Sequence, residues 1–315
     1  MINSTEILNS WKPEICVLGP GGMKGFLIIG ALIKLFKTGY LDEVHTFIGC
    51  SVGVIISALL ASGYKPEEIA EDALQVDIFH DSIELTLSDF KNNVGIISNR
   101  DIKKLLSDKI IARFGKIVTL KELYDITGIT LVSVTLNLTT DTTEYLSWET
   151  EPNISVVDAA LLSINIPLLF YKLEYKGNIY IDGAFGNPYP VDYLDNGKRK
   201  ILGISITSRV PNTIDPVATD NMRYIYKVAH ASITQLKKKI DASCSSQCRH
   251  LTLHSPCMDT TGISFTHDTK LRLLTIGYES AKRFLFSTSE ISIITEEDKY
   301  IDIVESLESV QYEEC

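Results

Sequence analysis

Two short apolar runs near the start of the chain are each followed by a glycine-rich turn and then by an apolar helical pattern. The runs are Ile15–Leu18 and Val44–Ile48, and the turns are Gly19–Gly25 and Gly49–Gly53. Repeated strand–turn–helix units are typical of an α/β fold, with a mainly parallel central sheet flanked by helices. In a parallel sheet the two turns can lie side by side at the same end.

Further segments extend this pattern. Short runs rich in β-branched and apolar residues predict strands, and apolar residues at helical spacing predict helices. The expected strands are Ile129–Leu136, Leu173–Tyr175, Ile179–Ile181, Ile201–Ile206 and Leu251–Leu253, and the expected helices are Lys24–Lys37, Val54–Ser62, one beginning at Pro66, Val157–Ser163 and Leu271–Phe286.

The charge balance limits the partners. The net charge of −10 argues against nucleic acid, because phosphate binding needs a basic surface. The most apolar early run, Phe26–Phe36, is too short to span a bilayer, and the polar N-terminus does not have the pattern of a secretory signal. Six cysteines without such a signal indicate intracellular thiols. We therefore expect a cytoplasmic protein without a transmembrane segment, peripheral on membranes where it meets them.

The second turn, Gly49-Cys50-Ser51-Val52-Gly53, matches the pattern G-x-S-x-G between a predicted strand and a predicted helix. In that pattern the serine lies on a sharp turn, and small flanking residues let the backbone bend. Ser51 would then stand at the start of a helix whose amide dipoles favour negative charge on its oxygen. The alternative is an ordinary helix-capping serine, so the motif makes Ser51 a candidate nucleophile.

The first turn, Gly19-Pro20-Gly21-Gly22-Met23-Lys24-Gly25, invites three functional interpretations. A Walker loop requires Ser or Thr after its lysine, but Gly25 follows Lys24. A dinucleotide turn requires glycine where Pro20 stands. Consecutive glycines at a helix start can also direct backbone N–H groups at an anion, as an oxyanion hole does. A tight turn without a ligand is the remaining alternative.

A third motif surrounds Asp182. The segment Tyr180-Ile181-Asp182-Gly183-Ala184 ends a predicted strand with an aspartate in a turn of small residues, and Asn187-Pro188 follow. On its own, such an aspartate is expected to bond to its own backbone as a turn residue.

Together the three motifs resemble those of the patatin-like phospholipase family. The family pattern is G-G-G-x-[RK]-G, then G-x-S-x-G, then D-G-[GA] followed by Asn and Pro; here PGGMKG, GCSVG and DGAFGNPYP occur in that order. Connecting segments such as DAALLSINIPLLF are also similar. The resemblance covers residues 14–287 as one domain, between an N-terminal extension (1–13) and an acidic C-terminal tail (288–315), and implies a three-layer sandwich.

The resemblance implies a lipid acyl hydrolase, of phospholipase A or lysophospholipase type, that cleaves acyl esters of phospholipids or glycerolipids at a membrane or micelle surface. Ser51 corresponds to the nucleophile and Asp182 to its base, in a dyad that uses no histidine, metal or cofactor. Gly21, Gly22 and Met23 correspond to the oxyanion hole. The other motif positions are Lys24, Gly25, Gly49, Gly53, Gly183 and Ala184.

Two positions depart from the family pattern. Pro20 replaces the first glycine and removes one backbone donor, while Ala184 replaces the last glycine of D-G-G. Because Pro20 alters the oxyanion turn, a catalytically weak binding protein is one alternative, and an acyltransferase on the same dyad is another. The motifs leave the head group, the acyl position and the oligomeric state open.

Two further alternatives involve histidines and cysteines. A Ser–His–Asp hydrolase would draw its base from His230, His250, His254 or His267, but its nucleophile follows a later strand than Ser51 does. A zinc site is conceivable where thiols and imidazoles crowd together, although no C-x-x-C spacing occurs and we expect no ligand there. The residues concerned are Cys244, Cys248, His250, His254 and Cys257.

Overall fold

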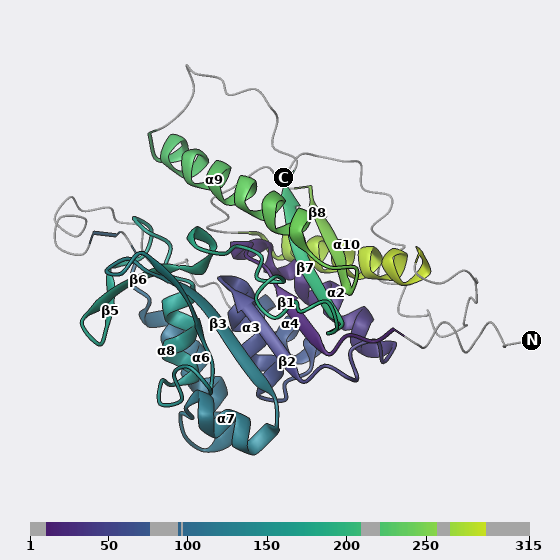
Figure 1. Cartoon of the computed structure of the whole chain (residues 1–315), viewed down its shortest axis with the longest axis horizontal. Coiled ribbons are helices and arrows are strands. Elements are labelled where there is room, and N and C mark those ends of the chain that lie inside the picture. Colours follow the sequence, from purple (N-terminus) through teal and green to yellow (C-terminus); the bar gives the residue numbers. More distant parts are fainter. Residues whose placement is uncertain (1–10, 76–93, 96, 209–220, 257–264, 288–315) are drawn as a thin grey trace, which may run out of the picture.

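One mixed sheet runs through the part of the chain that the computed structural model describes, which is residues 11–75, 94–95, 97–208, 221–256 and 265–287. Its hydrogen-bonded order is β5-β6-β3-β2-β1-β7-β8, and β4 pairs with β3 (Figure 1). The strands are β1 Ile15–Leu18, β2 Thr46–Cys50, β3 Thr130–Asn137, β4 Thr142–Leu146, β5 Leu173–Tyr175, β6 Asn178–Asp182, β7 Ile201–Ser208 and β8 Cys248–Ser255. The neighbours β3, β2, β1, β7 and β8 run parallel, whereas β4, β5 and β6 pair antiparallel.

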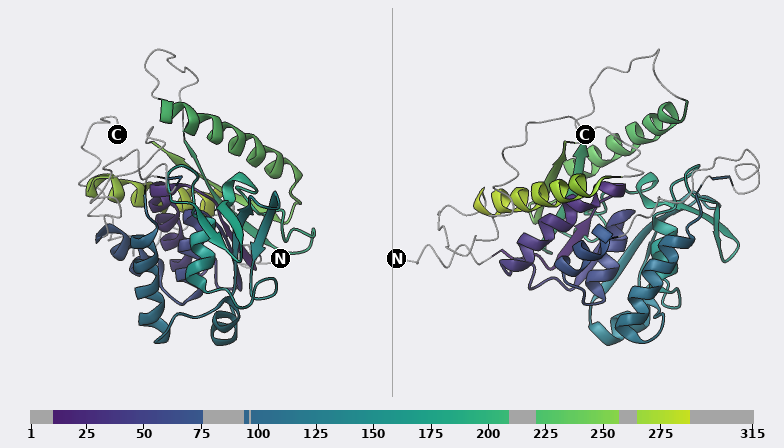
Figure 2. Two further views of the ribbon diagram at one scale, coloured as in Figure 1. Left: turned by 90° about the vertical axis from the view of Figure 1, so that its left-hand side faces the viewer. Right: turned by 180° about the vertical axis from the view of Figure 1, so that it is seen from behind.

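Helices cover both faces of this sheet, which gives three layers (Figures 1 and 2). Alternate residues of β1 show why: Cys16 and Leu18 belong to one apolar core, while Ile15 and Val17 belong to a second core on the other face. Residues of α2, α3, α8 and α10 form the first core, and α9 packs on the second. The helices are α2 Gly25–Lys37, α3 Val52–Ala61, α4 Pro66–Gln75, α6 Arg100–Phe114, α7 Leu120–Thr127, α8 Val156–Ser163, α9 Asn221–Ser243 and α10 His267–Ser287, with short 3-10 turns η1 Gly22–Lys24 and η2 Gly183–Phe185.

The edges of β3 explain how distant segments meet. Strand β4 pairs with Ser133–Asn137 and therefore occupies one edge of β3 along that stretch. Strand β2 pairs with Thr130–Val134 and β6 with Thr135–Asn137, so these two strands share the other edge, end to end. The last residue of β2 lies opposite Val134, and the last residue of β6 lies opposite the adjacent Thr135.

The predicted α/β fold with a mainly parallel sheet is confirmed, and the expected elements differ from the observed ones at their ends. Strand β4 and helices α6, α7 and α9 are further elements, whose bounds were not predicted. The second strand begins and ends two residues later than expected, at Thr46–Cys50, so it continues into the serine turn. Strand β8 spans Cys248–Ser255 rather than Leu251–Leu253, because polar residues alternate with buried ones along it. Most of the predicted N-terminal extension and all of the predicted tail lie outside the described residues.

Membrane-spanning helices were not expected from the sequence. Among the described residues, every helix falls short of the length and apolar character needed to cross a bilayer.

Candidate active site

The turn between β2 and α3 holds Ser51 in a strained backbone conformation, with φ 56° and ψ −132°. Residues other than glycine rarely adopt positive φ, and such strain is concentrated at functional sites. The turn also packs tightly against β1, because a Cβ atom at Gly53 would lie 2.2 Å from the carbonyl oxygen of Leu18. The strained strand-to-helix turn that G-x-S-x-G predicts is therefore present.

The backbone and the hydroxyl of Ser51 have separate surroundings. The Ser51 N–H donates a hydrogen bond of 3.1 Å to Oγ of Ser163, the last residue of α8. Although Ser51 stands at the N-cap of α3, its hydroxyl makes no capping bond to that helix. The ordinary role of a capping serine, which the sequence left open, thus does not account for this side chain.

Asp182 lies at the end of β6 and points into the protein, with 2% of its surface exposed. Its Oδ1 accepts a hydrogen bond of 2.8 Å from the N–H of Ala184, and its own N–H donates to the carbonyl of Asn165 at 2.9 Å. Its Oδ2 has no partner that meets hydrogen-bond distance and angle criteria. One carboxylate oxygen is thus held by a hydrogen bond, whereas the other accepts none.

Burial raises the pKa of Asp182 to about 6, and the Ser51 hydroxyl and the Ala184 N–H lower it in part. The Ser51 hydroxyl thus interacts with the Asp182 carboxylate, although no formed hydrogen bond joins it to Oδ2. Catalytic hydrogen bonds are often long or poorly aligned before substrate binds. A carboxylate with a raised pKa is a stronger base than an exposed one, and it is still ionised at neutral pH.

The glycine turn lies beside the serine turn. A Cβ atom at Gly25 would lie 2.8 Å from Cγ2 of Val52, the residue after Ser51. The turn η1 begins at Gly22, whose φ of 54° suits glycine, and its first N–H groups have no acceptor within the turn itself. The N–H of Lys24 is already used, since it donates to the Gly21 carbonyl at 3.0 Å. The oxyanion role of the Gly21, Gly22 and Met23 N–H groups stays a prediction.

Three polar residues that the sequence motifs did not single out hold the backbone around Ser51 and Asp182. Ser163 holds the Ser51 backbone, and Asn165 holds the Asp182 backbone and donates from Nδ2 to the Tyr180 carbonyl at 3.0 Å. The hydroxyl of Thr135, opposite Asp182 on β3, lies 3.0 Å from carbonyl oxygens of both α8 and β6. The available sequence clue was the segment DAALLSINIPLLF, which contains Ser163 and Asn165.

This arrangement lies within a segment that matches a known protein family. Residues 16–195, more than half of the chain, match the family model described as Patatin-like phospholipase. The chain belongs to the patatin-like phospholipase family. A relative from Invertebrate iridescent virus 6, named "Probable lipid hydrolase 463L", is 30% identical over 244 residues, which cover 74% of this chain and 82% of that protein.

Solved structures show the patatin-like fold as well. VipD from Legionella pneumophila superimposes with a TM-score of 0.57 at 16% identity, over 88% of this chain and 67% of that chain. The type III effector ExoU of Pseudomonas aeruginosa superimposes with a TM-score of 0.51 at 16% identity, over 89% of this chain and 54% of that chain. At such identities the likeness concerns the fold.

Three of the described histidines, His45, His250 and His254, bond to residues other than Ser51 and Asp182. His250 and His254 lie on β8, three strands away from β2, where their Nδ1 atoms lie 2.9 Å from the hydroxyls of Tyr189 and Thr207. His45 lies 3.1 Å from the Thr46 hydroxyl at the start of β2, whereas Ser51 follows its end. The side chain of His230 is outside the described set. Among the histidine side chains that are described, none is bonded to Ser51 or Asp182.

An apolar pocket of about 130 Å³ adjoins the glycine turn. Gly22, Met23 and Val52 line the pocket next to the two turns, and apolar side chains of α2, α3, α4 and α6 form most of the remaining lining. The lining also includes an ion pair in which Nζ of Lys109 lies 2.5 Å from Oδ2 of Asp72. The apolar lining residues are Phe26, Ile29, Ile55, Ile56, Leu59, Ile69, Ala73, Ile102, Leu105 and Leu106. A pocket of this character suits a hydrocarbon chain.

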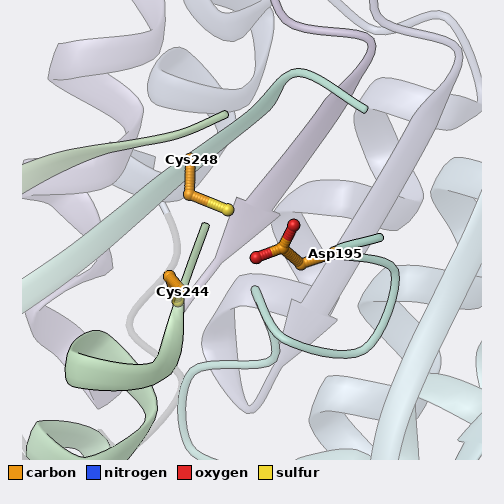
Figure 3. A group of neighbouring side chains, drawn as sticks. All are labelled: Asp195, Cys244 and Cys248. Carbon is orange, nitrogen blue, oxygen red and sulfur yellow. The ribbon is translucent and has the colours of Figure 1, made fainter. Parts of the chain in front are cut away.

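The cysteine- and histidine-rich segment does not assemble as a group of five. Cys244 and Cys248 approach each other, but the third residue beside them is Asp195 from a distant loop (Figure 3). His250 and His254 are engaged elsewhere, and Cys257 lies outside the described residues. Among the residues that the structure describes, Asp195, Cys244 and Cys248 are the group suited to hold a metal ion.

Proposed function

We propose that the protein hydrolyses acyl esters of phospholipids or other glycerolipids, with Ser51 as nucleophile and Asp182 as its base. The observation that carries this proposal is the strained Ser51 beside a buried carboxylate whose pKa is raised to about 6 and whose Oδ2 has no formed bond. Membership of the patatin-like family and the adjoining apolar pocket support a lipid substrate.

In the first half of the reaction, the Ser51 hydroxyl gives its proton to Asp182 while its oxygen bonds to the ester carbonyl carbon. The carbonyl oxygen becomes an oxyanion, which the N–H groups of Gly22 and Met23, with Gly21, would stabilise. One such donor lowers the activation barrier by about 3 kcal/mol. When the intermediate collapses, the carbon–oxygen bond to the alcohol breaks, and the alcohol leaves with the proton from Asp182.

In the second half, water attacks the acyl-serine ester, and Asp182 accepts a proton from that water. The acid is released, and Ser51 regains its proton. No histidine takes part in this sequence, because Asp182 acts first as base and then as acid in each half. A metal or cofactor is not required by any step.

The apolar pocket would bind the acyl chain of the substrate. Gly22, Met23 and Val52 belong both to the lining and to the two turns that surround the reacting carbonyl. A chain whose carbonyl lies at Ser51 would therefore enter between α2 and α3 and extend towards α4 and α6. Burying each CH₂ group there contributes about 0.8 kcal/mol to binding, so the pocket favours long-chain lipids over soluble esters.

The test is release of fatty acid from phospholipid in mixed micelles, measured by mass spectrometry for the wild type and for Ser51→Ala. The proposal expects release by the wild type alone, with both proteins equally folded by circular dichroism. Added acceptor alcohol that captured most acyl groups would favour an acyltransferase. Lipid binding without turnover in either protein would favour a binding protein and contradict the proposal.

A further inference from the structure

Asp195, Cys244 and Cys248 form a compact group that takes no part in the proposed reaction. Asp195 lies in the loop between η2 and β7, Cys244 immediately follows α9, and Cys248 is the first residue of β8 (Figure 3). One carboxylate oxygen and the two sulfur atoms all lie within 4.8 Å of one another. Segments separated by about 50 residues in the sequence thus direct three metal-binding atoms at one point.

The group lies at the opposite end of the parallel strands from Ser51. Cys248 pairs with Ile201, Ile201 pairs with Ile15, and Ile15 pairs with Thr46, so all four residues mark strand starts. Ser51 comes five residues after Thr46, which corresponds to roughly 16 Å along the strand direction. A ligand bound at the group would therefore not reach the dyad.

The Asp195 carboxylate is fixed and charged. Its Oδ2 accepts a bond of 2.7 Å from the Ser245 N–H, while its Oδ1 accepts bonds of 2.6 Å from the Ser245 hydroxyl and 3.0 Å from the Gly197 N–H. Burial raises the pKa of Asp195, but the hydrogen bonds from Ser245 and Gly197 together outweigh it and hold the pKa at about 2. Metal-binding carboxylates are commonly oriented by such outer hydrogen bonds.

Both cysteines carry free thiols. Cys244 donates its S–H to the Ile240 carbonyl, with the sulfur 3.1 Å from that oxygen. A divalent cation would replace two thiol protons, so its binding would leave the net charge of the group unchanged.

We propose that Asp195, Cys244 and Cys248 bind a thiophilic divalent cation of the zinc type, with water as the fourth ligand. Two S–H bonds break, two metal–sulfur bonds form, and both protons pass to solvent. Metal–sulfur distances of about 2.3 Å place tetrahedral ligands roughly 3.8 Å apart, so the side chains must close by up to about 1 Å. Rotation of the Cys244 side chain away from Ile240 supplies this movement.

The cation would stabilise the folded state and would not take part in catalysis. The loop that bears Asp195 follows the Asp182 turn along the chain, and the metal would tie this loop to the junction of α9 and β8. Because the three ligands come from separate segments, binding would stabilise the native state and not the unfolded chain. His250, the next imidazole along β8, is already paired with Tyr189 and is not a ligand here.

The experiment uses the full-length protein, reduced and freed of metal, and titrates it with Co²⁺ as a spectroscopic probe. Two thiolates on a four-coordinate cobalt ion give a thiolate-to-cobalt charge-transfer band and visible bands that Zn²⁺ then displaces. We expect the charge-transfer band and the visible bands with Co²⁺. We also expect a higher unfolding temperature with Zn²⁺ than without metal. Ester hydrolysis by the folded protein should be equal with Zn²⁺ and with chelator, so failure of this proposal is separable from failure of the proposed function.

Cys244→Ser and Cys248→Ser should each weaken Co²⁺ binding by more than the roughly 10- to 100-fold that loss of an outer-shell partner costs. Cys16→Ala is the control, since it removes a buried thiol of β1 that lies outside the group, and it should bind like the wild type. Wild-type protein without a charge-transfer band would overturn the proposal whatever the variants do. A band of full strength in the Cys244/Cys248 double variant would assign the binding to other thiols. A Cys244–Cys248 disulfide in protein purified without oxidant would likewise overturn it.

Discussion

Replacing Asp182 by asparagine should make the protein less active and, above pH 6, relatively more stable. The substitution preserves the shape of the side chain, and the amide oxygen still accepts the hydrogen bond from Ala184. The amide cannot accept the Ser51 proton, so activity should fall by roughly 10²- to 10⁴-fold, the usual contribution of a positioned base. The same change removes a buried negative charge.

The stability effect can be worked out from the pKa. A rise from 3.8 to about 6 in the folded protein corresponds to about 3 kcal/mol. Because the folded-state pKa of Asp182 is raised, its contribution to stability is fully present below about pH 4 and is lost as the pH rises through 6. The asparagine variant does not undergo this loss. An unsatisfied amide costs about 1–3 kcal/mol at every pH, so the pH dependence is the decisive quantity.

The assay is denaturant unfolding of wild type and variant at about pH 4 and about pH 8, with the free energies of unfolding compared at each pH. The variant should gain about 2–3 kcal/mol relative to wild type between the two conditions, since all other groups titrate alike in both proteins. Ser51→Ala retains Asp182 but removes a hydroxyl that lowers its pKa, so this control should show a pH dependence at least as large as that of the wild type. A constant difference across this pH range, or activity within tenfold of wild type, would refute the reasoning.

Three further predictions follow from the site. The kcat/KM of the wild type should decline below about pH 6, because ionised Asp182 is required; an acid limb near pH 4 would contradict the raised pKa. Ile55→Trp should fill the apolar pocket and reduce kcat/KM for palmitoyl esters at least roughly tenfold more than for butyryl esters; equal losses would remove the pocket from acyl binding. His250→Ala and His254→Ala should each retain most activity in an ester assay, and loss of activity in a folded variant would restore a histidine base.

The elements around the two turns were predictable because their causes are local. Short strand-like runs of four or five residues, each followed by a glycine, predicted β1 and β2, and the flanking Gly49 and Gly53 predicted the bend at Ser51. The motif could not show whether Ser51 serves only as a helix cap. That answer depends on its strained φ and on the direction of its hydroxyl, which emerge only when α3 and β2 are packed.

The supporting residues were not predictable from local patterns. Ser163 bonds to a residue 112 positions earlier in the chain, and Asp182 meets Ser51 because β2 and β6 share one edge of β3. Nothing in the spacing of these residues encodes that pairing. The Ser51–Asp182 pairing was inferred instead from the resemblance to a family. That resemblance gave no information about Thr135 or the Asn165 carbonyl.

The cysteine-rich segment shows the limit of sequence proximity as a guide to ligands. Five candidate residues crowd between Cys244 and Cys257, yet His250 and His254 bond to the hydroxyls of Tyr189 and Thr207 and do not join the thiols. The residue that does join Cys244 and Cys248 is Asp195, some 50 positions earlier. Only the pairing of β7 with β8 brings its loop to the thiols.

The central claim is that Ser51 is the nucleophile and that Asp182 activates it. Its most direct test is covalent labelling of the intact protein by a fluorophosphonate, followed by mass-spectrometric mapping of the modified residue. We expect one adduct, on Ser51, formed much more slowly in Asp182→Asn and absent in Ser51→Ala. An adduct on any other serine, or labelling of Ser51 at the same rate without the Asp182 carboxylate, would contradict it.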